Sequence, residues 1–340
     1  MGARLGKLIA AGVIYGAFAV YLYCPYFRGP EAVRIEDLFV FNVCAASLGC
    51  FVLSRRWLAG FWESLFAGAV YGFSPFVLWL GKFHPSAGLL AATVPWLFCP
   101  AAYGPRGRFR WLRWILALLP FLAIVLFFTV SAHFRLFAVP VESRLQLSDL
   151  GGLIAPLAMA KRGEMLIGFY HVPVASLVMG FSMLFAARRL GVMIVLASGV
   201  VLALSRPFLQ VSPVMWLTIP VLCCSVIIGA GMQGLISAGS ADKGWVLTSA
   251  VTLGVLAIVT LLLATKYFQV FASLADGYAR VFLESATMYI VGAVTAAIIF
   301  FSVRSNLRLA AVRLVLLALA MAVDIFLGAR FIIDRIFKVG

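Results

Sequence analysis

Long apolar runs recur along the chain, and they constrain its fold more than any other feature. Runs of roughly 17 to 25 residues cross the ~30 Å hydrocarbon core of a bilayer as α-helices. Hydrophobic residues make up 64% of the 340 residues and charged residues only 11%, a balance foreign to soluble domains. Backbone groups inside a bilayer must bond to one another, and runs without period-two alternation exclude a barrel. The sequence therefore predicts an all-α, polytopic integral membrane protein.

The apolar runs predict ten or eleven transmembrane helices in a single domain, 1–340, with no soluble domain. Ser74-Pro75 is expected to break the third span near its end, because proline cannot continue a helix. The stretch 145–160 is too short and too rich in glycine and proline to span, so it is expected to lie at the interface or to re-enter. The expected spans are 8–23, 38–54, 58–81, 86–104, 111–134, 164–187, 190–206, 213–237, 245–264, 282–302 and 309–329.

Basic residues are distributed as the positive-inside rule requires when the N-terminus is cytoplasmic. The inner segments then hold Arg4, Lys7, Arg55, Arg56, Arg106, Arg108, Arg110, Arg113, Arg188, Arg189, Lys243, Arg304, Arg308 and Arg313. The net charge of +15 is explained by contact with anionic lipid headgroups, so it does not predict a nucleic-acid partner. We take the membrane to be a bacterial inner membrane.

An acidic pair, Glu36-Asp37, stands at the entrance to the second span, on the outer side of the membrane in this orientation. Two carboxylates at a membrane surface can bind a divalent cation or supply a general base, so both residues are candidate catalytic groups. The alternative is that these charges set the topology and stabilise the positive end of a helix dipole. No metal is specified by the sequence.

Basic residues flank the 145–160 stretch, and they are candidates for binding a lipid phosphate or pyrophosphate. They are Arg135, Arg144, Lys161 and Arg162. Guanidinium groups make strong charge-assisted bonds to phosphate, whereas ordinary snorkelling to lipid headgroups is the alternative. His84 also lies at an outer helix end and is a candidate auxiliary ligand.

Other polar features carry less functional information. The six cysteines show no C-x-x-C spacing and are expected to be small apolar fillers. The run 229–234 matches G-x-G-x-x-G, but it lies inside an apolar helix without the strand of a nucleotide-binding unit, so close helix packing is expected instead. Asp324 is the only acid well inside an expected span, and a transport pathway for ions requires more than one such group.

Acidic residues follow the first span, and four short motifs mark the rest of the N-terminal ~130 residues. The motifs are Ser54-Arg55-Arg56-Trp57-Leu58, Tyr71-Gly72-Phe73-Ser74-Pro75, Phe83-His84-Pro85 and Pro95-Trp96. In this pattern the N-terminal ~130 residues resemble bacterial GT-C-type polytopic glycosyltransferases. The resemblance implies that an acid of the first outer loop, Asp37 or Glu36, acts as base or metal ligand, and that the donor is a polyprenyl-phosphate sugar.

Two other functions remain open on the sequence. The chain is also typical of a noncatalytic transmembrane subunit of a larger membrane complex, whose partners would be other membrane subunits. A transporter or lipid flippase is the third candidate, because prolines interrupt several spans and broken helices can line a path. All three functions share membrane lipids as partners.

Overall fold

The computed structural model describes residues 2–27, 33–58, 60–104, 110–134, 152, 155, 157, 173–270, 276–305 and 309–338. Over these ranges the chain is built from helices joined by turns, without a named strand. The predicted all-α class is confirmed. Clustering of the backbone divides the chain into two compact units. Unit 1 is Met1–Gln146 with Arg189–Val226, and unit 2 is Leu147–Arg188 with Ile227–Gly340.

Seven helices in the described part of the chain are long and apolar enough to cross a membrane, as an integral membrane protein requires. They are Leu5–Tyr26, Pro85–Tyr103, Trp111–His133, Pro213–Ser237, Ser240–Lys266, Tyr278–Arg304 and Ala310–Phe337. Each coincides with an expected span. The last one is longer than expected, because the helix continues to Lys338 instead of ending near residue 329.

The expected span 38–54 coincides with an apolar helix that is part of α2 (Val33–Ser54). Among the described residues, the apolar helices Val174–Ala186 and Leu190–Leu204 lie within the expected spans 164–187 and 190–206. The span expected at 58–81 is a pair of helices, α3 (Phe61–Gly72) and α4 (Pro75–Phe83), bent by 41°. The predicted break at Ser74-Pro75 is confirmed: Pro75 starts α4, and the Ser74 hydroxyl caps it by accepting from the Val77 N–H at 3.2 Å.

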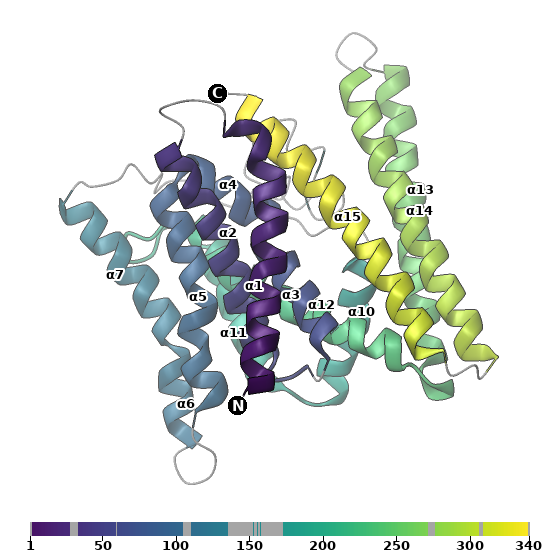
Figure 1. The fold of residues 1–340 in the computed structure, drawn as a ribbon, viewed down its shortest axis with the longest axis horizontal. Helices are drawn as coiled ribbons and strands as arrows, with labels where there is room; N and C mark the ends of the chain where they lie inside the picture. Colours follow the sequence, from purple (N-terminus) through teal and green to yellow (C-terminus); the bar gives the residue numbers. More distant parts are fainter. Residues whose placement is uncertain are drawn as a thin grey trace. The chain divides into compact units, whose positions relative to one another are not determined.

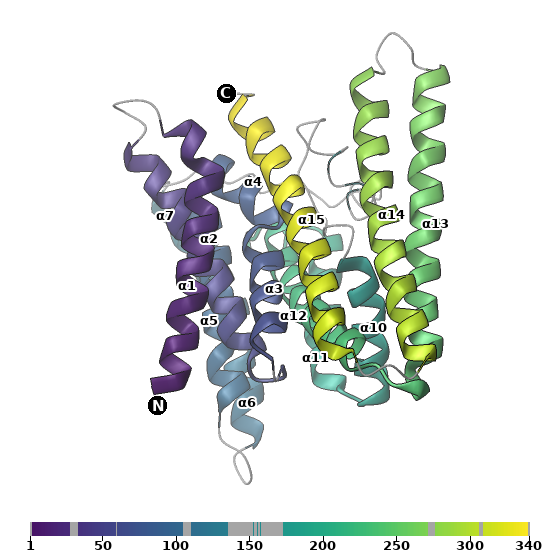
Figure 2. The same ribbon diagram turned by 45° about the vertical axis from the view of Figure 1, so that its right-hand side comes forward.

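In unit 1 the central helix is α2, which packs against α1, α3, α4 and α5. Figures 1 and 2 show α1 and α2 running side by side in opposite directions. The helices of this unit, besides α3 and α4, are α1 (Gly2–Tyr23), η1 (Cys24–Tyr26), α2 (Val33–Ser54), α5 (Pro85–Tyr103), α6 (Arg110–Ala117), α7 (Leu119–Phe134), α11 (Leu190–Leu204), η3 (Pro213–Leu217) and the first half of α12 (Thr218–Ser237).

A buried tyrosine satisfies a backbone group that a proline leaves without its helical donor. Pro95 lies inside α5 and has no N–H, so the carbonyl of Ala91, four residues earlier, lacks its usual helical partner. The hydroxyl of Tyr71, which is fully buried, donates to that carbonyl at 2.7 Å. Since no water competes in an apolar interior, this hydrogen bond links the end of α3 to α5.

Unit 2 is organised around a long helical hairpin. Helix α13 (Lys243–Val270) packs along α14 (Asp276–Arg304), and α10 (Pro173–Ala186) packs on α13. Figures 1 and 2 show α15 (Ala310–Lys338) close to α14 where the two are joined and diverging from it further along. The short η4 (Ser240–Asp242) precedes α13.

The glycine-rich run in α12 serves helix packing, as expected. A Cβ on Gly231 would overlap the backbone carbonyl of Ser176 in α10, and one on Gly234 would stand 2.9 Å from the Met183 sulfur. Gly180 of α10 similarly lies against the carbonyl of Ile227. Glycines on both helices therefore allow α10 and the second half of α12 to approach at backbone distance.

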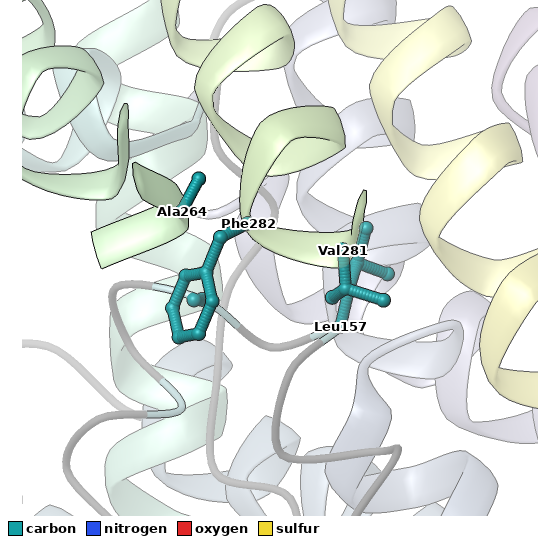
Figure 3. Close-up of a cluster of buried hydrophobic side chains, with 5 residues drawn as sticks. Leu157, Ala264, Val281 and Phe282 are labelled. Carbon is teal, nitrogen blue, oxygen red and sulfur yellow. The ribbon is translucent and has the colours of Figure 1, made fainter. Parts of the chain in front are cut away.

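A small apolar cluster joins part of the stretch 145–160 to the α13–α14 hairpin. Ala155 and Leu157 are buried and pack with Ala264 of α13 and with Val281 and Phe282 of α14 (Figure 3). Phe331 of α15 packs against the same cluster. The described residues of this stretch therefore contribute to the core of unit 2. The expectation that it re-enters the membrane or lies at its surface stays a prediction.

Candidate functional site

The acidic pair lies in the first turns of α2. Glu36 and Asp37 are the fourth and fifth residues of this helix, and their side chains lie outside the described residues. Two residues after Asp37, Phe39 is already buried in unit 1. The carboxylates are thus attached to the positive end of a helix whose next turn is part of the core.

Two glycines bring the joint between α4 and α5 against this same part of α2. A Cβ on Gly81 would stand 3.6 Å from the Phe39 ring and 3.2 Å from the Asn42 side-chain nitrogen. A Cβ on Gly88 would stand 2.9 Å from the Gly81 Cα and 3.0 Å from the same nitrogen. Larger residues at either position would push the helices apart. We name this region, α2 positions 33–42 with residues 79–88 of α4 and α5, the acidic end of unit 1.

His84 is part of the acidic end, because it stands at the joint itself. Its N–H bonds to the Leu80 carbonyl at the end of α4, and its own carbonyl accepts from Gly88 as α5 begins after Pro85. The imidazole is partly buried, and its centroid lies 5.4 Å from that of the Trp79 ring. The fold therefore brings the predicted auxiliary histidine to the end of unit 1 that carries the two predicted catalytic acids.

Asn42 is a polar residue of the acidic end that sequence reasoning missed. Its side chain is 2% exposed, and neither its nitrogen nor its oxygen has a hydrogen-bond partner among the described residues. Among the described residues, the buried hydroxyl of Ser47, deeper on the same helix, and the buried indole N–H of Trp79 also have no partner. The available signal was an asparagine isolated in an apolar span, where an unpaired amide is costly.

The other predicted residues are not assembled at this site by the described structure. Arg135, Arg144, Lys161 and Arg162 lie outside the described residues. His133 is exposed in the last turn of α7. Within the described ranges, no group of three histidine, cysteine, aspartate or glutamate side chains could hold a metal ion. A divalent cation therefore remains a hypothesis about Glu36 and Asp37.

Arginines at the opposite end of unit 1 bind helix-end carbonyls. Arg56 donates to the Ala102 carbonyl at 2.9 Å, and Arg113 donates to the Gly104 carbonyl at 2.7 Å, so both stabilise the C-terminal end of α5. Arg55 bonds the Gly60 carbonyl, and the Glu63 carboxylate folds over Gly60 at the start of α3. These charges stabilise helix ends, which is a structural role.

Unit 2 also contains buried polar and charged groups inside its helices. Asp324 in α15 is 1% exposed, and it interacts electrostatically with Tyr289 of α14, which is fully buried. Both residues lie near the middle of their helices. Arg313, at the start of α15, is 5% exposed and donates to the Ala238 carbonyl at 2.7 Å and to the Ser302 hydroxyl at 3.1 Å.

Comparison of the chain with protein-family models, with curated proteins and with solved structures gave no match. The geometry of the acidic end is therefore the main structural guide to function.

Proposed function

We propose that the protein is a membrane glycosyltransferase of GT-C type that uses a polyprenyl-phosphate sugar at the extracytoplasmic face of a bacterial inner membrane. One observation carries the proposal: the first turns of α2, with Glu36 and Asp37, and the α4–α5 joint, with His84, meet at one end of unit 1. Of the motifs that resemble the GT-C family, Phe83-His84-Pro85 lies at this end. The N-terminus is cytoplasmic in this proposal, because the basic segments then face inward.

In the proposed reaction, the Asp37 carboxylate accepts the proton of an acceptor hydroxyl, and Glu36 is its alternative. The hydroxyl oxygen forms a bond to the anomeric carbon of the donor sugar while the bond from that carbon to the phosphate oxygen breaks. The departing polyprenyl phosphate keeps the electron pair. Arg135, Arg144, Lys161 and Arg162 are the proposed partners of the negative charge that develops on it.

The two carboxylates also supply the ligands for a divalent cation in the proposed site. Carboxylate oxygens are the ligands that Mg²⁺ and Ca²⁺ prefer. A cation there would balance the phosphate charge of the donor. His84 stands at the same end as an auxiliary polar group.

The test is transfer of a labelled hexose from a short-chain polyprenyl-phosphate hexose by the purified full chain in proteoliposomes. Asp37→Asn and Glu36→Gln each keep the side-chain shape and remove the charge. We expect the variant that removes the base to lower transfer by about 10²- to 10⁴-fold. Glu284→Gln is the matched control: Glu284 also follows the start of a long helix, but it forms an exposed ion pair with Arg280.

The result that overturns the proposal is transfer at the wild-type rate by both acid variants. A wild-type chain that transfers no sugar and is stable only together with other membrane proteins would instead indicate the noncatalytic subunit. Uptake or lipid translocation without sugar transfer would indicate the transporter or flippase.

A further inference from the structure

Two arginines meet at the C-terminal end of α5, opposite the acidic end of unit 1. Arg56, in the turn after α2, donates from Nε to the Ala102 carbonyl at 2.9 Å. Arg113 of α6, which packs on α5, donates from a terminal guanidinium nitrogen to the Gly104 carbonyl at 2.7 Å. We name the region formed by these four residues the basic end of unit 1.

The positive charge of the basic end exceeds what the helix end can balance. The two accepting residues are two apart in sequence, so their Cα atoms are at most about 7.6 Å apart. The C-terminal end of α5 supplies roughly half a negative charge against two full positive ones. Each arginine uses one N–H of the five in its guanidinium for its carbonyl, and neither forms an ion pair with a described residue.

The missing negative charge is not supplied by the described part of unit 1. Glu63 is the only acid among the described side chains of this unit. Its carboxylate folds over Gly60, whose carbonyl accepts from Arg55. The Nε of Arg113 is buried and has no partner among the described residues. The basic end thus has donors and net charge left for an anion.

Exposed aromatic side chains lie beside the two arginines. Trp57 follows one arginine in sequence, Tyr103 lies between the two accepting carbonyls, and Trp111 and Trp114 precede and follow the other arginine in α6. These four side chains are 37–59% exposed. Tryptophan and tyrosine concentrate where a membrane meets water, because one part of each side chain is apolar and another part is polar. An anion at the basic end would therefore lie at the level of lipid headgroups.

The chemistry of the basic end favours one class of lipid. Phosphodiester oxygens accept the charge-assisted bonds that guanidinium groups make well. A zwitterionic phospholipid also carries an ammonium group, which two adjacent arginines would repel. An anionic phospholipid has the phosphate without the ammonium, and its glycerol and acyl chains can pack on the exposed aromatic rings.

We propose that the basic end of unit 1 binds one anionic phospholipid, whose phosphate accepts hydrogen bonds from Arg56 and Arg113. This inference goes beyond the proposed function and does not depend on it, since the proposed catalytic acids lie at the other end of the unit. It differs from a general attraction between basic loops and the membrane, because it requires a single site with defined residues.

The experiment is native mass spectrometry of the delipidated full chain with phosphatidylglycerol or phosphatidylethanolamine added at equal concentrations. We expect the wild type to retain one phosphatidylglycerol about tenfold more tightly than phosphatidylethanolamine. Arg56→Gln and Arg113→Gln each remove the charge and keep an N–H donor, and each is expected to weaken phosphatidylglycerol binding about fivefold. Arg56→Lys keeps the charge and should retain most of the preference.

Arg304→Gln is the matched control. Arg304 is exposed in the last turn of α14, in unit 2, and the sequence places it on the same predicted side of the membrane. We expect this variant to bind phosphatidylglycerol like the wild type. An equal loss in Arg304→Gln and in the two site variants would overturn the inference, because affinity would then follow total charge.

Two measurements on the wild type decide the matter even where an arginine variant does not fold. Equal affinity for the two lipids overturns the inference. Inorganic phosphate at millimolar concentration is expected to leave the bound phosphatidylglycerol in place. Its displacement by phosphate would show a site for soluble anions, and the assignment to a lipid would be wrong.

Discussion

Replacing Tyr71 with phenylalanine removes one hydroxyl and leaves the ring in place. The resulting loss in the free energy of unfolding should depend on whether Pro95 is present. The Tyr71 hydroxyl donates to the Ala91 carbonyl at 2.7 Å, and Pro95 is the reason that this carbonyl lacks a helical donor. In the phenylalanine variant the carbonyl is buried without a partner. We expect the free energy of unfolding to fall by about 1–2 kcal/mol, within the range for an unsatisfied buried acceptor and for hydrogen bonds between membrane helices.

Pro95→Ala supplies the missing N–H, so the Ala91 carbonyl gains a helical partner in that background. Tyr71→Phe should then cost at most about 0.5 kcal/mol, which gives an interaction energy of roughly 1 kcal/mol in a double-mutant cycle. Reversible unfolding of the four proteins in mixed detergent micelles measures it. The cycle cancels any separate effect of Pro95→Ala on helix propensity.

The matched control is Tyr15→Phe. Tyr15 is also buried and donates to a backbone carbonyl, that of Leu65 at 2.6 Å, but Leu65 lies inside α3 and has the N–H of residue 69 available. We expect the free energy of unfolding to fall less for this variant than for Tyr71→Phe, and we expect the same loss with and without Pro95. An equal cost of Tyr71→Phe in both backgrounds would refute the reasoning, because the hydroxyl would then not be replacing the proline's missing donor.

Three further outcomes are expected from the packing of unit 2, each measured as a change in the free energy of unfolding. Gly231→Ala should lose about 1–3 kcal/mol because its Cβ would overlap a backbone carbonyl, whereas Gly254→Ala, which meets nothing within 4 Å, should be neutral or stabilising. Arg313→Lys should lose about 1–3 kcal/mol, since one ammonium cannot reproduce the two directed guanidinium bonds. Tyr289→Phe and Asp324→Asn should show an interaction energy of about 0.5–2 kcal/mol, and additive effects would contradict an electrostatic interaction between the two residues.

The acidic end illustrates how much of a site a sequence can indicate. Glu36, Asp37 and His84 were identified because charged and titratable residues are rare in this chain and stand out at the ends of apolar runs. The sequence could not bring them together, because the approach of α4 to α2 depends on Gly81 and Gly88, and glycines are common throughout the chain. The four basic candidates flanking 145–160 stay predictions.

The sequence by itself determined the all-α membrane class, the positions of the apolar segments and the break at Ser74-Pro75. The physical reason is that the bilayer thickness fixes the length of a span, and proline fixes where a helix stops. The helix lengths were less well determined, because α15 runs on to Lys338 instead of ending near residue 329.

Only the tertiary structure decided which faces of the helices meet. Spans that are apolar all round carry no periodic signal for the buried face, so the pairing of Tyr71 with Ala91 and the burial of Asn42 could not be predicted. The packing of Ala155 and Leu157 against α13 and α14 could not be predicted either, because contacts between segments far apart in the sequence depend on tertiary packing. The bilayer requires that the apolar segments form helices, because their backbone groups must bond to one another. Which helices pack together depends on where small residues allow two backbones to come close.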